Sequence, residues 1–208
     1  MRLMHHDIDW PLLYSYRRCP YAMRARMALR VAGIQCKIID IHLRHKPEHM
    51  LRVSPKGTVP VLCLSTDEVI DESLDIMRWA LHKNDPQQWL DGLHNAKAQY
   101  LLLQTDGPFK QALDQYKYAS RFPEANPVQS RQRAMASLIE PLADHLKHQP
   151  FIGGDKPVLQ DVAIFPFVRQ FAGVEPSWFE SHVDVSVRDW LHGWVSSELF
   201  VAIMQKPG

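Results

Sequence analysis

The apolar and polar positions of the first eighty residues follow strand and helix periods in turn. Residues 11–16 form a short apolar and aromatic run, which predicts a strand. In residues 20–32 alanine and leucine recur at helical spacing, the three arginines take the other faces, and Gly33 ends the predicted helix. Residues 36–43 predict a second strand, and this strand, helix, strand order with short joints implies a parallel pair.

A second pattern follows, in which two strands precede a helix. Residues 58–64 and 68–71 are strand-like and are joined by a short polar stretch, so they predict an antiparallel hairpin. Residues 73–82 then predict a helix. The combined order predicts an α/β sheet of four strands and does not match a doubly wound nucleotide-binding fold.

The rest of the chain shows helical periodicity and no convincing strand. A stretch containing Pro, Asn, Asp and Gly precedes it, so we expect domains at residues 1–83 and 94–208 with a linker over 84–93. A break is expected at the Asp-Gly-Pro sequence of residues 106–108, and a bend at Pro141. The predicted helices cover residues 95–120, 127–149, 161–172, 187–197 and 199–205.

Composition and charge narrow the class of protein. The 208 residues suit two small domains, and a net charge of +1 argues against a basic surface for nucleic acid. No apolar run approaches the roughly 20 residues of a membrane span, and residues 1–10 lack the apolar segment of a signal peptide. Three cysteines without export signals indicate free thiols in a reducing cytoplasm. None is paired at two-residue spacing, so we expect no metal site.

Cys19 lies between a predicted strand and a predicted helix, directly before Pro20. Because proline favours the first helical turn, Cys19 is the expected N-cap residue. Its sulfur would face unpaired backbone N–H groups and the positive end of the helix dipole, and Arg17 and Arg18 would add positive charge. The sequence therefore predicts a lowered Cys19 pKa and a reactive thiolate. The alternative is a cysteine that only caps a helix.

Two further stretches suit a peptide ligand. Pro60 interrupts a strand-like run, and a cis Val59–Pro60 bond would leave the backbone polar groups of Val59 available to pair an extended peptide. Glu72 and Ser73 precede a helix, where a carboxylate side chain can meet an ammonium group and the helix start can bind a carboxylate. From the residues alone, a trans proline and simple helix capping stay open as alternatives.

These features together suit a thiol peptide with an amino-acid end, such as glutathione. In kind, order and spacing, residues 13–29, 41–49, 54–62 and 70–73 are similar to motifs of the glutathione transferase superfamily, in particular its omega class and the two-domain glutaredoxins. The resemblance covers nearly the whole chain. It implies the glutathione transferase fold, with a thioredoxin-like α/β N-terminal domain and an all-α, helical C-terminal domain.

The resemblance also implies roles for individual residues. Val59 would pair through its backbone with the cysteinyl part of glutathione, ahead of a cis Pro60. Lys46 would meet the glycyl carboxylate, and Glu72 and Ser73 would hold the γ-glutamyl end. The implied catalytic residue is Cys19, and the implied glutathione-binding residues are Lys46, Val59, Pro60, Glu72 and Ser73.

Ala22 stands where dithiol enzymes of this fold carry a second cysteine. A single thiol can attack a mixed glutathione disulfide and be released by a second glutathione, but an adjacent thiol cannot resolve it. We therefore expect a glutathione-dependent monothiol transferase that performs thiol–disulfide exchange, deglutathionylation or dehydroascorbate-type reduction, with glutathione as co-substrate. Conjugation of a small electrophile is the first alternative, served by a hydroxyl of Tyr14, Ser15 or Tyr16.

The second alternative is a non-enzymatic regulatory protein of the same fold, like the stringent starvation proteins that contact RNA polymerase. Such proteins tend to lack a competent thiol at the helix start, so the combination of Cys19, Lys46 and the Glu72–Ser73 pair favours an enzyme. The expected partners are glutathione and a mixed disulfide or small electrophile, with no nucleic acid and no membrane. The sequence leaves open the second substrate, the residues of the hydrophobic pocket, and the choice between monomer and homodimer.

One departure from the family pattern precedes the helix predicted over residues 161–172. The family usually places Ser or Thr three residues before an Asp, which forms a capping box. Here Val158 takes the cap position and Asp161 remains. We expect Asp161 to accept a backbone N–H, the cap to be weaker by about 1 kcal/mol with the fold intact, and Val158→Ser to raise the thermal midpoint.

Overall fold

The computed structural model describes residues 11–65 and 67–205, which form two compact units. One unit runs to Pro86 and takes in the chain from Ala202 onward, and the other runs from Gln87 to Val201. The sequence interpretation of residues 1–10 falls outside the described residues. The linker over residues 84–93 stays a prediction, although a short 3-10 helix already begins inside it at Trp89, whose side chain is fully buried.

The first unit is an α/β sheet with three helices. Its sheet has the strand order β2-β1-β3-β4, in which β1 pairs parallel with β2 and antiparallel with β3, and β3 pairs antiparallel with β4. This confirms the predicted parallel pair, the hairpin and the thioredoxin-like fold class. The elements are β1 (Leu12–Ser15), α1 (Pro20–Val31), β2 (Lys37–Asp40), α2 (Glu48–Val53), β3 (Val61–Cys63), β4 (Val69–Ile70) and α3 (Ser73–Lys83).

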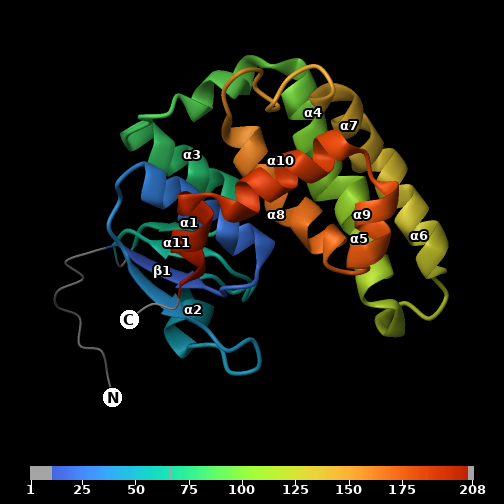
Figure 1. The fold of residues 1–208 in the computed structure, drawn as a ribbon. Coiled ribbons are helices and arrows are strands. Elements are labelled where there is room, and N and C mark those ends of the chain that lie inside the picture. The colour runs from blue at the N-terminus through green and yellow to red at the C-terminus, as the bar shows by residue number, and fades with distance from the viewer. Residues whose placement is uncertain (1–10, 66, 206–208) are drawn as a thin grey trace. The chain divides into compact units, whose positions relative to one another are not determined.

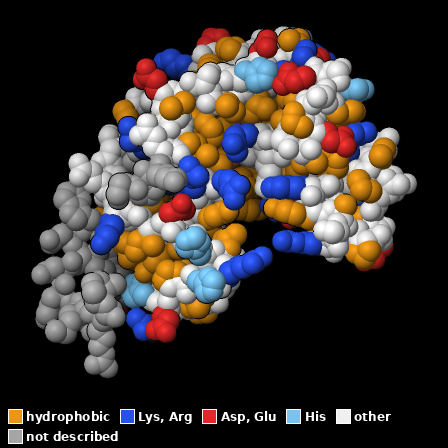
Figure 2. Space-filling model, turned by 60° about the horizontal axis from the view of Figure 1, so that its bottom comes forward, with side chains coloured by type: hydrophobic (Ala, Val, Ile, Leu, Met, Phe, Trp, Pro, Cys, Tyr) orange, Lys and Arg blue, Asp and Glu red, His pale blue; other side chains and the backbone are white. Residues whose placement is uncertain are grey.

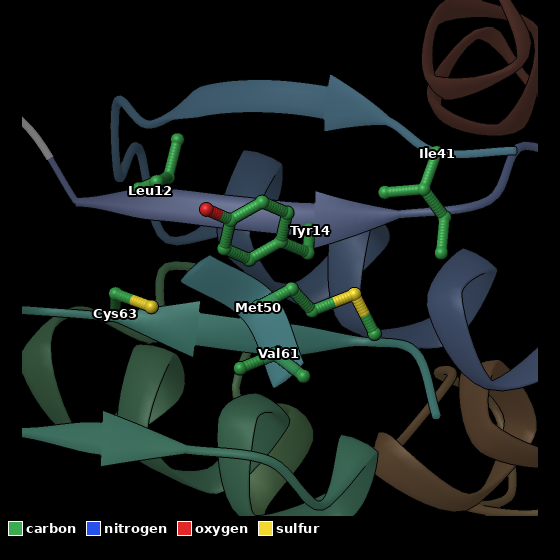
Figure 3. Close-up of a cluster of buried hydrophobic side chains, with 6 residues drawn as sticks. All are labelled: Leu12, Tyr14, Ile41, Met50, Val61 and Cys63. Atoms are coloured by element: carbon green, nitrogen blue, oxygen red, sulfur yellow. The ribbon is translucent and has the colours of Figure 1, made fainter. Parts of the chain in front are cut away.

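Helix α2 is the element of this unit that the sequence pattern missed. It has six residues, and of these Met50 alone is classed as buried, so it offers too short a periodic run to recognise. In Figure 1, α2 lies on one side of the sheet and α1 and α3 lie on the other. Because side chains alternate along a strand, β1 contributes side chains to both faces of the sheet. Leu12 and Tyr14 pack toward Met50 of α2. Figure 3 shows this cluster with the side chains of β3 that complete it.

The opposite face of the sheet buries two arginines of α1. The helical pattern places Arg24 and Arg26 away from the apolar face, yet their exposed fractions are 2% and 5%. Arg24 Nε donates to Ser73 Oγ of α3 at 2.9 Å, and Arg26 Nη1 donates to Ser15 Oγ of β1 at 2.8 Å. Hydrogen bonds to buried serines therefore allow both side chains to lie in the interior, which the periodicity of α1 alone did not indicate.

Every described element of the second unit is a helix, as the sequence predicted, and the last one, α11, continues into the first unit at Ala202. Two long predicted helices are each interrupted by a π-helical turn, and α9 is a short helix that the sequence pattern missed. The elements are η1 (Trp89–His94), α4 (Ala96–Gln104), η2 (Thr105–Phe109), α5 (Lys110–Lys117), η3 (Ala119–Arg121), α6 (Pro127–Ala134), η4 (Met135–Ile139), α7 (Glu140–Leu146), α8 (Leu159–Ala172), α9 (Pro176–His182), α10 (Val185–Ser196) and α11 (Glu198–Met204).

The expected break between α4 and α5 is confirmed at Gly107. Its backbone angles of φ −107° and ψ −106° are not helical, and Pro108 follows it without an N–H to donate. Pro141 is accommodated differently, because it lies in the first turn of α7, directly after the π-helical turn η4. The helical backbone continues from α6 through η4 into α7, so the wider π-helical turn accommodates the missing Pro141 N–H.

Asp161 at the start of α8 organises this part of the second unit. Its Oδ2 accepts the Val158 N–H at 3.0 Å, which confirms the reach back to the cap residue. Its Oδ1 accepts the Ile152 N–H and the Trp190 Nε1–H, each at 2.9 Å. The carboxyl group is fully buried, and these three donors from three segments replace its water.

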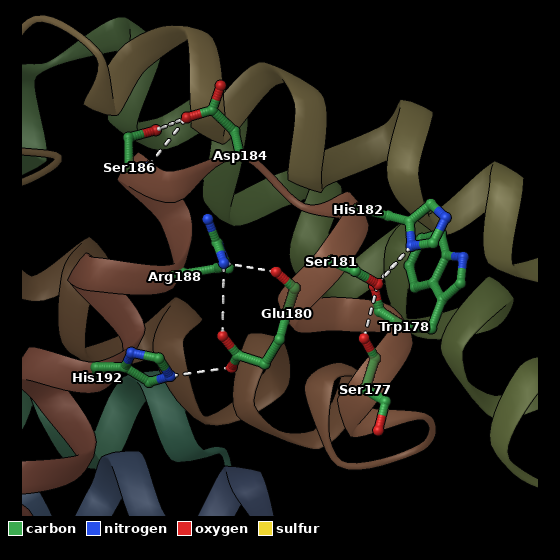
Figure 4. Close-up of polar contacts among 9 residues, drawn as sticks. All are labelled: Ser177, Trp178, Glu180, Ser181, His182, Asp184, Ser186, Arg188 and His192. Atoms are coloured by element: carbon green, nitrogen blue, oxygen red, sulfur yellow. Dashed lines mark hydrogen bonds and ion pairs between the residues drawn. The ribbon is translucent and has the colours of Figure 1, made fainter.

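The joint between α9 and α10 is held by polar contacts that Figure 4 shows. Asp184 caps α10 by accepting the Ser186 N–H at 3.0 Å. Glu180 lies one turn earlier in the chain. Its Oε1 is 3.1 Å from His192 Nε2, and its Oε2 is 3.7 Å from Arg188 Nη1. These contacts link α9 to α10 at an exposed surface, where each contributes little to stability.

No helix among residues 11–65 and 67–205 is long and apolar enough to span a bilayer. Basic, acidic and hydrophobic side chains all occur on the face shown in Figure 2. This mixture agrees with a net charge of +1 for the full sequence.

The side chain of Val158 modifies the prediction made for the α8 cap. It is 6% exposed and packs so closely against Gly92 and Gly153 that a methyl group on either glycine would lie within 2.8 Å of it. Serine at this position would supply the missing acceptor but would also lose buried methyl groups. Threonine keeps one methyl group and adds the acceptor.

We therefore expect Val158→Thr to stabilise the protein by about 1 kcal/mol, because its hydroxyl can accept a backbone N–H of the first turn. For about 200 residues this corresponds to roughly 2–4 °C in the thermal midpoint, measured by circular dichroism. Val158→Ser should gain less. Val162→Thr is the matched control, since it introduces the same hydroxyl inside α8 and should lower the midpoint. A Val158→Thr midpoint no higher than wild type contradicts the prediction.

Candidate functional site

Cys19 is the N-cap residue of α1, as the sequence predicted. Its backbone is extended, with φ −76° and ψ 123°, and Pro20 occupies the first helical turn. The Cys19 carbonyl accepts the Met23 N–H at 2.9 Å, which closes the first turn of the helix. The Cys19 side chain is partly exposed, so its sulfur is accessible at the end of β1 where α1 begins.

The backbone of Val59 lies directly against the Cys19 sulfur. The Val59–Pro60 peptide bond is cis, as the resemblance implied. The Cys19 Sγ–H donates to the Val59 carbonyl at 3.8 Å. Within the described chain, neither backbone polar group of Val59 takes part in a backbone–backbone hydrogen bond. A half-buried residue with available N–H and C=O groups can pair with an extended peptide, and here it would do so beside the thiol.

The loop before Val59 is linked to the start of α3 by charged groups. Ser54 Oγ, which is fully buried, donates to Asp71 Oδ2 at 2.7 Å. Lys56 Nζ lies 2.5 Å from Glu72 Oε1 and 3.3 Å from Asp71 Oδ1. No role was predicted for Lys56, because a single lysine in a loop carries no distinguishing sequence signal. In the structure it connects the loop to the carboxylates.

Lys46 and Glu72 border this loop from two sides. Lys46 is exposed and its side chain follows the backbone at Gly57, where an added methyl group would lie 3.4 Å from Lys46 Nζ. Gly57 has a φ of +62°, which favours glycine. Glu72 is the N-cap residue of α3, and its side chain is 67% exposed, so its carboxylate remains accessible although Lys56 contacts one oxygen.

Ser73 occupies a different environment from the one predicted. It is 3% exposed and its hydroxyl accepts the Arg24 Nε–H, so this group is already used inside the first unit. Arg24 also lies over the Tyr21 ring, 5.0 Å from its centroid. The role implied for the Ser73 side chain toward a ligand stays a prediction, and the hydrogen bond with Arg24 fixes the first turn of α3 against α1.

The predicted lowering of the Cys19 pKa is wrong. Burial raises the pKa of the Cys19 thiol and outweighs the backbone N–H groups of Ala22 and Tyr21, which lower it. Arg26 and Arg24 also lower this pKa. The sequence analysis placed the cations at Arg17 and Arg18 instead. Removing a thiolate from water raises the pKa of the thiol, and only the folded structure shows how far Cys19 is buried.

Arg17 and Arg18 have other contacts. The Arg17 backbone N–H donates to Asp40 Oδ1 at 2.8 Å, and Arg18 Nη2 donates to the Tyr16 hydroxyl at 3.1 Å. Both contacts are exposed to solvent. Two arginines adjacent in sequence to a thiol therefore need not be the cations that lower its pKa.

The hydroxyl groups before Cys19 take separate faces of the sheet. Tyr14 is 2% exposed and its hydroxyl shares a 2.8 Å hydrogen bond with His49 Nδ1 on the α2 side. Ser15 is fully buried on the α1 side, where Arg26 donates to its hydroxyl. Neither hydroxyl is presented at the accessible end of α1. This arrangement gives the Tyr14 and Ser15 hydroxyls no evident access to a bound thiol.

A cavity of about 620 Å³ lies wholly within the second unit. Tyr100 and Gln104 of α4 contribute to its lining. Tyr116 is buried, and its pKa is raised to about 12, mainly by burial and also by the negative charge of Glu175. No cluster of metal-ligating side chains is found within the described ranges.

Comparison with known proteins gives the same two-part division. Residues 13–89 match the family described as glutathione S-transferase, N-terminal domain, and residues 87–196 match glutathione S-transferase, C-terminal domain. Glutathione S-transferase omega-1 of Mus musculus is 28% identical over 177 residues, which cover 78% of this chain and 68% of the mouse protein.

Solved structures share the fold. Glutathione transferase Omega 3C from Trametes versicolor has a TM-score of 0.75 at 18% identity, with 98% of this chain and 92% of that chain covered. A glutathione transferase family member from Pseudomonas fluorescens, solved with two glutathione bound, has a TM-score of 0.77 at 21% identity, with 95% and 93% covered.

The raised Cys19 pKa predicts how its alkylation depends on pH. Because the thiolate is the nucleophile, the rate with iodoacetamide should rise with pH, and its midpoint should lie above that of the unfolded peptide Tyr14–Ala22. The peptide is the matched control because it keeps Arg17 and Arg18. Peptide-resolved mass spectrometry measures the rate at Cys19 alone. A midpoint below that of the peptide contradicts the prediction.

Proposed function

Because the chain belongs to the glutathione S-transferase family, we propose that it is a glutathione-dependent thiol transferase in which Cys19 is the nucleophile. It is an enzyme of this family, and the proposal concerns which chemistry it performs. The observation that carries the proposal is the 3.8 Å contact between the Cys19 sulfur and the carbonyl of Val59. A peptide whose backbone pairs with Val59 would therefore lie beside Cys19, and so would the sulfur of its cysteinyl residue.

The charged groups around the loop suit the two ends of glutathione. The Val59 backbone would pair with the cysteinyl residue, with the cis Pro60 following it. The exposed Lys46 ammonium group near Gly57 suits the glycyl carboxylate. Glu72 suits the γ-glutamyl ammonium group, and the N-terminus of α3 beginning at Ser73 suits its carboxylate. Each charged group of glutathione would thus face a side chain of opposite charge or the N-terminus of a helix.

The proposed reaction proceeds by two thiol–disulfide exchanges. The Cys19 thiol first loses its proton to solvent, and the thiolate attacks the glutathione sulfur of a mixed disulfide. A bond forms between Cys19 and glutathione, the original disulfide bond breaks, and the substrate leaves as a thiolate that takes a proton. A second glutathione thiolate then attacks the Cys19-bound glutathione sulfur, which regenerates Cys19 and releases oxidised glutathione. The substrate is reduced, and glutathione supplies the electrons.

The other two cysteines are poorly suited to resolve the Cys19 adduct. Cys63 is fully buried in the cluster on the α2 side of the sheet. Cys36 precedes β2, at the end of that strand remote from the α1 start, and burial raises its pKa to about 11. Because Ala22 replaces a second active-site cysteine, the resolving thiol has to come from outside the chain. This supports a monothiol mechanism.

The alternatives have less support from the site. A conjugating enzyme needs a hydroxyl group that activates the thiol of glutathione. Tyr14 and Ser15 are buried and bonded elsewhere, and the hydroxyl of Tyr16 accepts the Arg18 Nη2–H. A non-enzymatic regulatory role is not favoured, because the chain keeps an accessible thiol next to an available backbone. A reducing cytoplasm, which supplies glutathione, is part of the proposal.

Replacement of Cys19 tests the nucleophile directly. We expect Cys19→Ser to lose thiol-transfer activity toward a glutathionylated peptide by at least about 100-fold, because serine is not ionised at neutral pH. Wild-type protein treated with oxidised glutathione should gain one glutathionyl group in intact mass, and the variant should gain none. Cys36→Ser is the matched control and should behave as wild type. Full activity in Cys19→Ser would contradict the proposal and, with an aromatic chloride as second substrate, would favour conjugation.

Neutral replacements of the charged groups test how glutathione is held. We expect Lys46→Gln and Glu72→Gln each to raise the KM for glutathione about 10-fold with little change in kcat, since each removes one charged contact with the ligand. Lys37→Gln is the control, because Lys37 is exposed in the same unit at the start of β2, away from the α1 end of the sheet. Steady-state kinetics at varied glutathione measures the effect. An unchanged KM in both variants contradicts the assignment.

A further inference from the structure

We propose that Arg26 is a positioning residue whose buried guanidinium group favours the ionised form of the Cys19 sulfur. The inference rests on the proposed function, because it concerns the thiol assigned there as the nucleophile. Neither the implied glutathione contacts nor the helix-capping argument assigns a role to Arg26.

The spacing along α1 places Arg26 on the same face as Cys19. The two residues are seven apart, which is close to two full turns of an α-helix. Long helical side chains point back toward the N-terminus, so the guanidinium group extends from Arg26 toward the start of α1. Its contacts agree with this direction: they are made with Ser15 and Arg17, which both precede Cys19 in the chain.

Three contacts hold the guanidinium group in place. Nη1 donates to Ser15 Oγ at 2.8 Å, and Nη2 donates to the Arg17 carbonyl at 2.8 Å. Nη2 also lies 3.9 Å from Met204 Sδ, at the end of α11. The side chain is 5% exposed, and its Nε is buried without a hydrogen-bond partner. A group fixed by β1, the following loop and the C-terminal helix has little freedom to move.

No carboxylate among the described residues forms an ion pair with Arg26. Its hydrogen-bond acceptors among the described residues are a hydroxyl, a carbonyl and a sulfur, none of which carries a charge. Burial lowers the pKa of Arg26 to about 10, which still leaves it a cation at neutral pH. A buried cation with no carboxylate in ion-pair contact costs free energy, and a further anion nearby reduces that cost. The Cys19 thiolate is such an anion.

The charged groups that act on this pair come from three neighbouring segments. Asp40, at the end of β2, and Cys19 both favour the cationic form of Arg26, and Arg17 opposes it. At Cys19 itself, Arg26 acts together with Arg24 against burial. Arg24 is hydrogen-bonded to Ser73, whereas the acceptors of Arg26 are all at the Cys19 end of α1. Arg26 is therefore the cation to test first.

The experiment compares the pH dependence of Cys19 alkylation by iodoacetamide in the full-length wild type, Arg26→Gln and Arg26→Lys. We expect the midpoint to rise by about one pH unit or more in Arg26→Gln, because the opposite charge is lost. Arg26→Lys keeps the charge and should recover most of the shift. Arg30→Gln is the matched control, since Arg30 is exposed in the last turn of α1, and its midpoint should equal that of wild type.

An unchanged midpoint in folded Arg26→Gln overturns the inference, as does an equal shift in Arg26→Lys and Arg26→Gln, which would indicate a purely structural role. Circular dichroism establishes folding. If Arg26→Gln does not fold, Ser15→Ala decides: it removes one acceptor of the guanidinium group, so we expect a smaller rise, and no rise overturns the inference.

This outcome is separate from that of the proposed function. Alkylation reports the acidity of Cys19 whatever its natural substrate. Loss of the proposed function would appear as thiol transfer that survives Cys19→Ser, and that result would leave the alkylation midpoints of the Arg26 variants unaffected.

Discussion

The Cys19 sulfur is subject to two opposed effects, and the arrangement of the first unit follows from both. Burial beside the Val59 carbonyl favours a neutral thiol, whereas the first backbone N–H groups of α1 and two buried arginines favour a thiolate. Both effects require the start of α1 to be held against the loop that ends at Pro60. The four-stranded sheet meets this requirement, because β1 leads into α1 and pairs with β3, which follows the loop.

The loop before Pro60 depends on contacts of unequal weight. The exposed contacts of Lys56 are individually weak in water, because solvent screens them. The buried Ser54 hydroxyl, bonded to Asp71, is the more durable link, since breaking it would leave a polar group unpaired away from solvent. The loop is thus anchored at its start by Ser54 and at its end by β3, and the carboxylate of Glu72 stays accessible.

Much of the fold could be predicted because it follows from local patterns. Apolar runs in β1 and β3, helical spacing in α1 and α3, and Pro20 after Cys19 are visible in one sequence and were confirmed. The break at Gly107 also followed from local chemistry. Helices α2 and α9 were missed because six and seven residues are too few to establish a period. The candidate site was predicted mainly through the resemblance of combined motifs, since no single residue identified it.

The sequence by itself determined most of the secondary structure, the N-cap position of Cys19 and the absence of a second cysteine beside it, because each depends on neighbours in the chain. Only the tertiary structure decided which cations act on the sulfur, since the buried Arg24 and Arg26 lower its pKa, rather than Arg17 and Arg18, which are adjacent to it in sequence. It also decided that burial raises the pKa of Cys19, because solvent access depends on segments, such as Val59, that are distant along the chain.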